Sequence, residues 1–137
     1  KEQLISFEAS KLAKDKGFNL EVYNAYRGDN KNLVDLGDVW HYGCEGGMEL
    51  EEWFYDYNSY SHRLLISAPT QSLLQRWLRE VHDISIKVDD YYYNSKVRYD
   101  VNVSKLGSQE DNTKGVYETY EQALEAGLLE GLKLIEV

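Results

Sequence analysis

The amino-acid sequence predicts an α+β fold: a small, mainly antiparallel sheet with three helices packed on one face. Three observations predict it. Apolar residues recur at helical spacing in three stretches, they alternate with polar residues between the second and third stretch, and hydrophobic residues make up 42% of the 137-residue chain. A chain of this size buries a core without disulfides, so we expect a single domain over residues 1–137.

The first helix is predicted over Glu2–Lys16, because apolar residues there follow helical spacing and Gly17 stands where a glycine commonly ends a helix. Residues 18–26, FNLEVYNAY, alternate between apolar and polar side chains and predict a strand. The residues from Arg27 to Asn30 then predict a turn.

The stretch from Lys31 to His62 is rich in glycine and aromatic residues and has no clear period. A structureless loop of this length is unusual in a compact domain, so we expect short strands over 34–42 and a short helix over 48–55. The apolar residues 64–66 predict either a short buried strand or the lead-in to the next helix.

A central helix is predicted over Thr70–Asp83. Pro69 and Thr70 mark its start, since proline suits the first turn of a helix. Its apolar residues form one broad stripe that we expect to face the core. The stripe consists of Leu73, Leu74, Trp77, Leu78 and Val81.

Two antiparallel strands are predicted after this helix, because the apolar period changes to alternation over 84–88 and again over 97–103. Asn94 and Ser95 predict the tight turn between them. Residues 106–115 have the composition of a flexible loop, and Val116 with Tyr117 predicts a third short strand.

The last helix is predicted over Thr119–Ile135, with Thr119 as its cap and Gln122 at the position that completes a capping box. Gly127 and Gly131 each lower helix propensity by about 1 kcal/mol relative to alanine. Their presence therefore indicates close packing of this helix against the sheet.

The second half of the chain thus follows an α-β-β-β-α order, and in this order of elements it resembles the double-stranded-RNA-binding domain. In that family the last helix opens with lysines that bind phosphates. Here the corresponding stretch carries Glu118, Glu121 and Glu125, whose carboxylates repel phosphate. RNA binding is therefore not expected from this resemblance.

Three stretches of the chain resemble small uncharacterised proteins of phages, prophages and mobile elements of gut bacteria of the Bacteroidetes type. The stretches are SFEASKLAKDKGF, APTQSLLQRWLREVH and YETYEQALEAGLLEGLKLI. The resemblance implies a phage or mobile-element context and carries no established activity, cofactor or catalytic residue.

Charge and composition narrow the classes of partner. The formal net charge of −9 repels nucleic acid and anionic lipid, so direct nucleic-acid binding is not expected. No apolar run approaches the roughly 20 residues that cross a bilayer, and a lone cysteine suits a reducing compartment. We therefore expect a soluble cytoplasmic protein without membrane attachment.

Residues with catalytic or metal-binding chemistry are few. His41 and Cys44 have the spacing of half a zinc site, but Glu45 and His62 complete a ligand set only through the fold. The acidic pairs Glu51–Glu52 and Asp89–Asp90 indicate solvated surface. His82, near the end of the central helix, is expected to be a helix-end cation or a capping donor. We expect no metal, cofactor or catalytic residue; a small enzyme or metal site around His41 and Cys44 is one alternative.

The leading functional hypothesis is a non-enzymatic domain that binds a host or phage protein. Tyrosine and tryptophan are enriched at protein interfaces, and the chain has more aromatic rings than one small core needs. The predicted binding residues are Tyr91, Tyr92, Tyr93, Trp53, Tyr55, Tyr57 and Tyr60. A second alternative is a nucleic-acid-related protein, such as an acidic DNA mimic whose carboxylates imitate phosphates.

Overall fold

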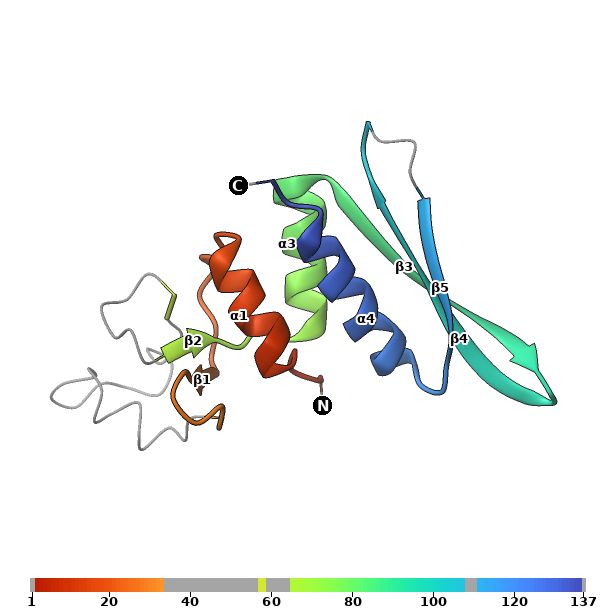
Figure 1. The fold of residues 1–137 in the computed structure, drawn as a ribbon, viewed down its shortest axis with the longest axis horizontal. Coiled ribbons are helices and arrows are strands. Elements are labelled where there is room, and N and C mark those ends of the chain that lie inside the picture. The colour runs from red at the N-terminus through yellow and green to blue at the C-terminus, as the bar shows by residue number, and fades with distance from the viewer. Residues whose placement is uncertain (1, 34–56, 59–64, 108–110, 137) are drawn as a thin grey trace, which may run out of the picture. The chain divides into compact units, whose positions relative to one another are not determined.

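The computed structural model describes residues 2–33, 57–58, 65–107 and 111–136 (Figure 1). These residues confirm the predicted α+β class, with helices and antiparallel strands along the chain, although the strands form two sheets and not one. The elements are α1 (Phe7–Asp15), β1 (Ala25–Arg27), β2 (Leu65–Ser67), α3 (Gln71–His82), β3 (Ile84–Tyr93), β4 (Lys96–Lys105), β5 (Asp111–Tyr117) and α4 (Tyr120–Lys133).

The chain divides into two compact units. The N-terminal unit is Ile5–Pro69, with α1, β1 and β2, and the C-terminal unit is Lys1–Leu4 with Thr70–Val137, with the remaining elements. Of the three helices that we expected on one sheet, α3 and α4 contact the three-stranded sheet, whereas α1 contacts β2 of the other sheet. The single domain over residues 1–137 stays a prediction.

Helix α1 begins later than the sequence predicts. Ser6 is its N-cap, and the Ser6 hydroxyl accepts a hydrogen bond from the backbone N–H of Ala9 at 3.1 Å. The residues before it are held outside the helix, because Leu4 forms a β-bridge with Thr70. At the other end Gly17 has a φ of +94°, the left-handed conformation that a glycine after a helix commonly adopts.

The two-stranded sheet of the N-terminal unit pairs β1 with β2, with Tyr26 opposite Ile66. The strand predicted over 18–26 forms only at its end, over Ala25–Arg27, whereas the predicted strand at 64–66 forms over Leu65–Ser67. The Tyr26 hydroxyl donates a hydrogen bond to the carbonyl oxygen of Ile5 at 2.7 Å, which ties the sheet to the start of α1.

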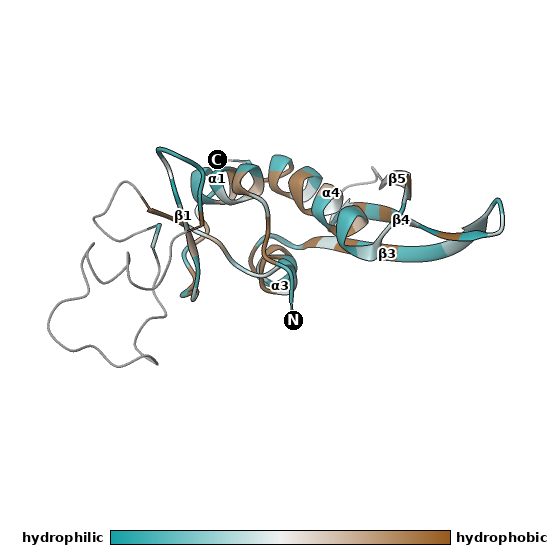
Figure 2. Ribbon diagram, turned by 90° about the horizontal axis from the view of Figure 1, so that it is seen from below, coloured by the Kyte–Doolittle hydropathy of each residue, from teal (hydrophilic) through white to brown (hydrophobic). Residues whose placement is uncertain are grey.

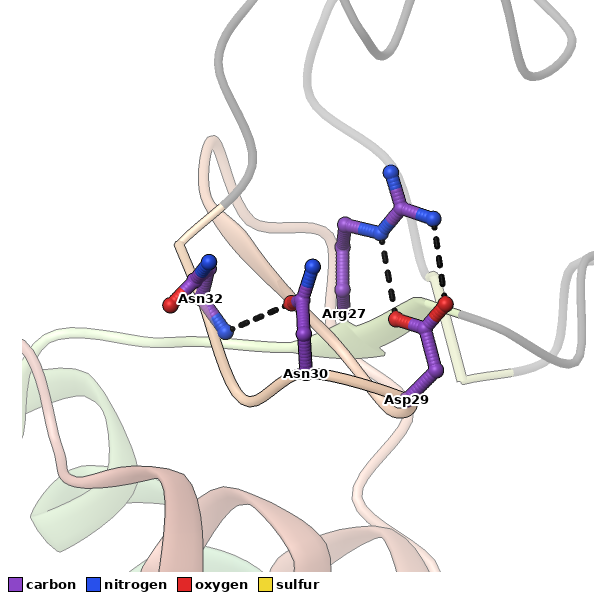
Figure 3. A network of polar contacts seen from close by, with 4 residues as sticks. All are labelled: Arg27, Asp29, Asn30 and Asn32. Atoms are coloured by element: carbon purple, nitrogen blue, oxygen red, sulfur yellow. Dashed lines mark hydrogen bonds and ion pairs between the residues drawn. The ribbon is translucent and has the colours of Figure 1, made fainter.

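The turn after β1 is confirmed, and polar contacts hold it (Figure 3). Arg27 donates two hydrogen bonds to the Asp29 carboxylate, at 3.2 and 3.1 Å, and this contact lowers the pKa of Asp29 below its usual value. The side-chain oxygen of Asn30 accepts from the backbone N–H of Asn32 at 2.9 Å. Lys31, between Asn30 and Asn32, has a φ of +63°.

Helix α3 is capped by Thr70, whose hydroxyl accepts from the backbone N–H of Leu73. Pro69 therefore precedes the cap and does not lie in the first turn. Leu74, Trp77 and Leu78 are buried as the stripe predicts, but Val81 is exposed. The stripe ends one turn early because the chain reverses at Asp83, in the left-handed conformation, to enter β3.

The three-stranded sheet has the order β3-β4-β5, and every neighbouring pair is antiparallel. The predicted hairpin β3–β4 forms with Ile86 opposite Val103. Strand β5 begins at Asp111, inside the predicted loop, because a polar stretch that lies at the edge of a sheet needs no apolar pattern. A register shift at Tyr99/Asp100 accompanies a φ of +71° at Val116, so β5 contains a bulge.

Helix α4 completes the predicted α-β-β-β-α order and contacts all three strands of the sheet and α3. Thr119 caps it, while the Gln122 side chain accepts from the N–H of Glu118, one residue before the cap. Figure 2 shows the apolar colour on the parts of β3 and β4 that lie beside the helices, and the hydrophilic colour at the hairpin turn.

The predicted close packing at the two glycines of α4 is confirmed. A Cβ added at Gly127 would lie 2.5 Å from Cγ2 of Val101 and 2.8 Å from Cγ2 of Ile86. At Gly131 the nearest atom, Cδ1 of Ile86, would lie at 3.1 Å. The helix therefore reaches the sheet at a distance that excludes a side chain at position 127.

We expect Gly127→Ala to lower the free energy of unfolding by about 1–3 kcal/mol, because two buried branched side chains must move to make room for the new methyl group. This cost of overpacking outweighs the gain of about 1 kcal/mol in helix propensity. Gly131→Ala, with longer contacts, is the matched control and should destabilise less. Urea unfolding followed by circular dichroism measures both. Equal stability of the two variants would contradict the close contact at position 127.

Candidate protein-binding face on the projecting hairpin

The hairpin β3–β4 is fixed in register by a two-residue turn. Asn94 and Ser95 have φ values of +52° and +62°, and Tyr93 lies opposite Lys96. Two successive residues with positive φ form the type I′ turn, whose twist matches that of paired strands. The turn therefore determines which side chains of the hairpin share a face.

The hairpin extends beyond the helix that covers it. Ten residues of β3 span about 33 Å, whereas the fourteen residues of α4 span about 21 Å. Figure 1 shows the paired ends of β3 and β4 projecting past the start of α4. No helix of the described residues thus covers the last residues of β3 and the first of β4.

The register assigns each tyrosine of the run to a face. Tyr92 lies opposite Val97, on the face that further along holds Ile86 and Val101 against α4. Tyr91 and Tyr93 lie on the other face of the sheet, since side chains alternate along a strand. The predicted division of the run, with the middle ring opposite to its neighbours, agrees with this register.

The helix-side surface of the projecting hairpin is apolar and exposed. Tyr92 is 81% exposed and Val97 is 38% exposed. The next residue on this face, Tyr99, makes an edge-to-face contact with Tyr120 at the start of α4, with ring centroids 6.3 Å apart. We call this surface, formed by Tyr92, Val97, Tyr99 and Tyr120, the hairpin face.

Carboxylates lie around the hairpin face. Asp90 lies directly opposite Tyr99 in the register, and Glu118 and Glu121 flank Tyr120 in the sequence. All three are exposed, and none forms an ion pair with another residue that the structure describes. The hairpin face therefore combines exposed rings with uncompensated negative charge.

The opposite face of the sheet is more polar. Tyr91 is half-buried, and its hydroxyl lies 3.8 Å from the position that a Cβ would take at Gly115. Arg98 lies opposite Tyr91, and Asp89 lies opposite Asp100. Charges of both signs thus share this face.

The other predicted binding residues are not part of the hairpin face. Tyr57 belongs to the N-terminal unit and is 2% exposed, so its ring lies in the core and not on a binding surface. Trp53, Tyr55 and Tyr60 lie outside the described residues, as do the strands and helix predicted over 34–42 and 48–55.

The candidates for metal binding or catalysis are mostly outside the described residues as well. This holds for His41, Cys44, Glu45, His62 and the pair Glu51–Glu52. Asp89 and Asp90 point to opposite faces of β3, so these neighbours do not act together. Within the part of the chain that the structure describes, no three His, Cys, Asp or Glu residues are grouped to hold a metal ion.

Sequence reasoning missed Val97, Tyr99 and Tyr120 as surface residues, because each one fits the apolar pattern of its strand or helix. The signal that identifies them is a difference in length: two ten-residue strands cannot be covered by one fourteen-residue helix. The apolar positions at the uncovered end are then expected to be exposed.

Comparison with protein families, curated proteins and solved structures found no match to this chain. Among the helices of the described residues, none has the length and apolar character needed to cross a bilayer.

His82 lies at the end of α3, where the sequence predicts a helix-end cation or a capping donor. Its ring packs edge-to-face against Trp77, with centroids 4.6 Å apart. Burial, and then the nearby charge of Lys105, lower the pKa of His82 below its usual 6.5, while Asp83 acts in the opposite direction. The surroundings of His82 thus disfavour its charged form.

A histidine with a lowered pKa in the folded protein binds a proton more readily when the chain unfolds. We therefore expect the stability that neutral His82 contributes to be present above pH 6.5, the usual pKa of histidine, and to be lost as the pH falls below it through the lowered pKa of the folded state. Urea unfolding at a series of pH values should show that the free energy of unfolding falls less with decreasing pH for His82→Asn than for the wild-type chain. Parallel curves for the two proteins would refute this role of His82.

Proposed function

We propose that this chain is a non-enzymatic protein-interaction domain and that it binds its partner through the hairpin face. The observation that carries the proposal is the exposure of Tyr92, 81%, beside Val97 on a face that the fold otherwise buries under α4. Scattered apolar residues are normal on a protein surface, but here they are adjacent and continue into the Tyr99–Tyr120 pair.

Tyrosine is the residue expected at such a surface. Its ring supplies contact area at a small entropic cost, while its hydroxyl remains hydrated in the free protein. A rigid type I′ turn holds the two strands in place before any partner arrives, and this preorganisation lowers the cost of binding. The hairpin face therefore has the chemistry and the rigidity of a binding surface.

The charge around the hairpin face favours protein over nucleic acid. Asp90, Glu118 and Glu121 repel phosphates, and the formal net charge is −9. An acidic DNA mimic is less favoured, because Lys87 and Arg98 lie among Asp89 and Asp100 on the open face of the sheet. The alternative of an enzyme or metal site around His41 and Cys44 stays a prediction on residues that the structure does not describe.

The resemblance to proteins of phages and mobile elements supports a phage or prophage origin, with a host or phage protein as the partner. The lone cysteine and the acidic composition suit a protein that acts in the cytoplasm.

The test compares adjacent tyrosines on opposite faces. The purified chain serves as bait in a lysate of gut Bacteroidetes, and mass spectrometry identifies proteins that it enriches. We expect Tyr92→Ser to lower recovery of a partner by about tenfold or more, because an exposed aromatic anchor is lost. Tyr93→Ser, the matched control on the other face, should leave recovery unchanged.

Melting temperatures of both variants show whether each one folds. If Tyr92→Ser folds normally and recovers the same proteins as the wild-type chain, the hairpin face is not the binding surface. If the wild-type chain enriches no protein over the resin without bait, the proposal of an interaction domain fails.

A further inference from the structure

Among the strands that the structure describes, β3 pairs only with β4, so β3 is an edge of the three-stranded sheet. In a hairpin with a two-residue turn, the pair that closes the turn exchanges hydrogen bonds, and here this pair is Tyr93 with Lys96. The odd-numbered residues of β3 therefore bond to β4, and the backbone groups of the even-numbered residues point away from the sheet. The contact at Ile86 agrees, since its carbonyl oxygen accepts a hydrogen bond from the Gln75 side chain at 2.8 Å.

Beyond Ile86 no strand of the described residues pairs with this edge. The outward backbone groups of Val88, Asp90 and Tyr92 have no hydrogen-bond partner among the residues that the structure describes. Asp90 and Tyr92 are exposed to solvent, and Val88 is partly exposed. A row of unpaired N–H and C=O groups on a straight strand is a template for another strand.

The other edge of the sheet is less suitable. The bulge at Val116, with a φ of +71°, interrupts the ladder of β5 and changes the direction of its backbone groups. Edge strands in natural proteins are commonly protected in this way. The regular part of β3 has no bulge that would protect it.

The charges on β3 indicate which strand fits. Asp89 and Asp90 are consecutive in β3, so their side chains point to different faces of the sheet. Asp89 is paired with Asp100 on the neighbouring strand, and this like-charged pair destabilises the sheet. A second copy of the chain, paired through the same stretch, would bring further carboxylates together. A strand with two consecutive basic residues would instead place one cation on each face and offset the repulsion between Asp89 and Asp100.

We propose that the partner adds an extended basic segment to the outer edge of β3, antiparallel to it, over Val88–Tyr92. Two consecutive Lys or Arg residues lie beside Asp89 and Asp90, and the two preceding apolar residues lie beside Tyr91 and Tyr92. The apolar residue on the helix side then extends the hairpin face. This inference rests on the proposed function and specifies how that surface recognises its partner.

The probe is a synthetic peptide of about ten residues, long enough to pair with β3, with the central sequence Val-Tyr-Lys-Arg flanked by threonines. A second peptide has Glu-Glu in place of Lys-Arg. A third carries N-methyl groups on alternate amides, so that it keeps the side chains and charge but lacks the N–H groups along one edge. Nuclear magnetic resonance titration and amide hydrogen exchange of the full chain report binding.

We expect the first peptide to protect the backbone amides of Val88, Asp90 and Tyr92 from exchange by tenfold or more at saturation, because these N–H groups gain partners. The acidic peptide should bind at least about tenfold more weakly. The third peptide, with its N-methyl groups on the edge that faces β3, should also bind at least about tenfold more weakly, since it cannot form the hydrogen bonds of the strand pair.

Two variants of the chain at one position separate strand addition from charge attraction. Asp90→Pro removes the outward N–H, and an edge strand tolerates proline where that N–H faces solvent. Asp90→Asn removes the same charge but keeps the N–H. We expect Asp90→Pro to abolish protection of Tyr92 while Asp90→Asn weakens binding only severalfold, with normal melting for both variants.

Each outcome decides between the alternatives. If the first peptide binds and Asp90→Pro or N-methylation leaves its affinity unchanged, side chains alone hold it and strand addition is wrong. If no saturable binding occurs, or if protection falls outside Val88–Tyr92, the inference is overturned. The pull-down with Tyr92→Ser is independent of both results, so the interaction function can stand while strand addition fails.

Discussion

The approach of α4 to the three-stranded sheet determines how the C-terminal unit is built. Gly127 lies against Val101 and Ile86, and Gly131 lies against Ile86, Ile84 and Leu78. Because neither glycine has a side chain, the helix sits close enough to bury one end of the hairpin. This contact fixes where α4 lies along the strands, and so which part of them remains uncovered.

The same strands therefore perform two tasks along their length. At one end Ile84, Ile86, Val101 and Val103 form the core under the helices. At the other end the alternation continues beyond the reach of the described helices, and Tyr92 and Val97 occupy positions that would otherwise be core. The capping contact of Thr119, which starts α4 beside Tyr120, marks the boundary between the two parts.

Sequence patterns predicted the C-terminal unit well, because its helices and strands pair mainly with their neighbours along the chain and carry clear periods. They predicted the N-terminal unit less well. The pairing of β1 with β2 joins residues separated by about forty positions, such as Tyr26 and Ile66, and a local pattern does not specify such a contact. The start of β5 was missed because its polar residues resemble a loop. For the candidate site, alternation assigned Tyr91–Tyr93 to two faces, but the exposure of Tyr92 depends on the position of α4.

The difference in length between β3 and α4 also has an evolutionary consequence. Substitutions at Tyr92 or Val97 alter side chains that contribute little to the buried core, so selection for folding constrains them weakly. The buried ends of the same strands have no such freedom. A lineage of such proteins can therefore diversify the tip of the hairpin rapidly while the glycines of α4 and the residues beneath them remain unchanged.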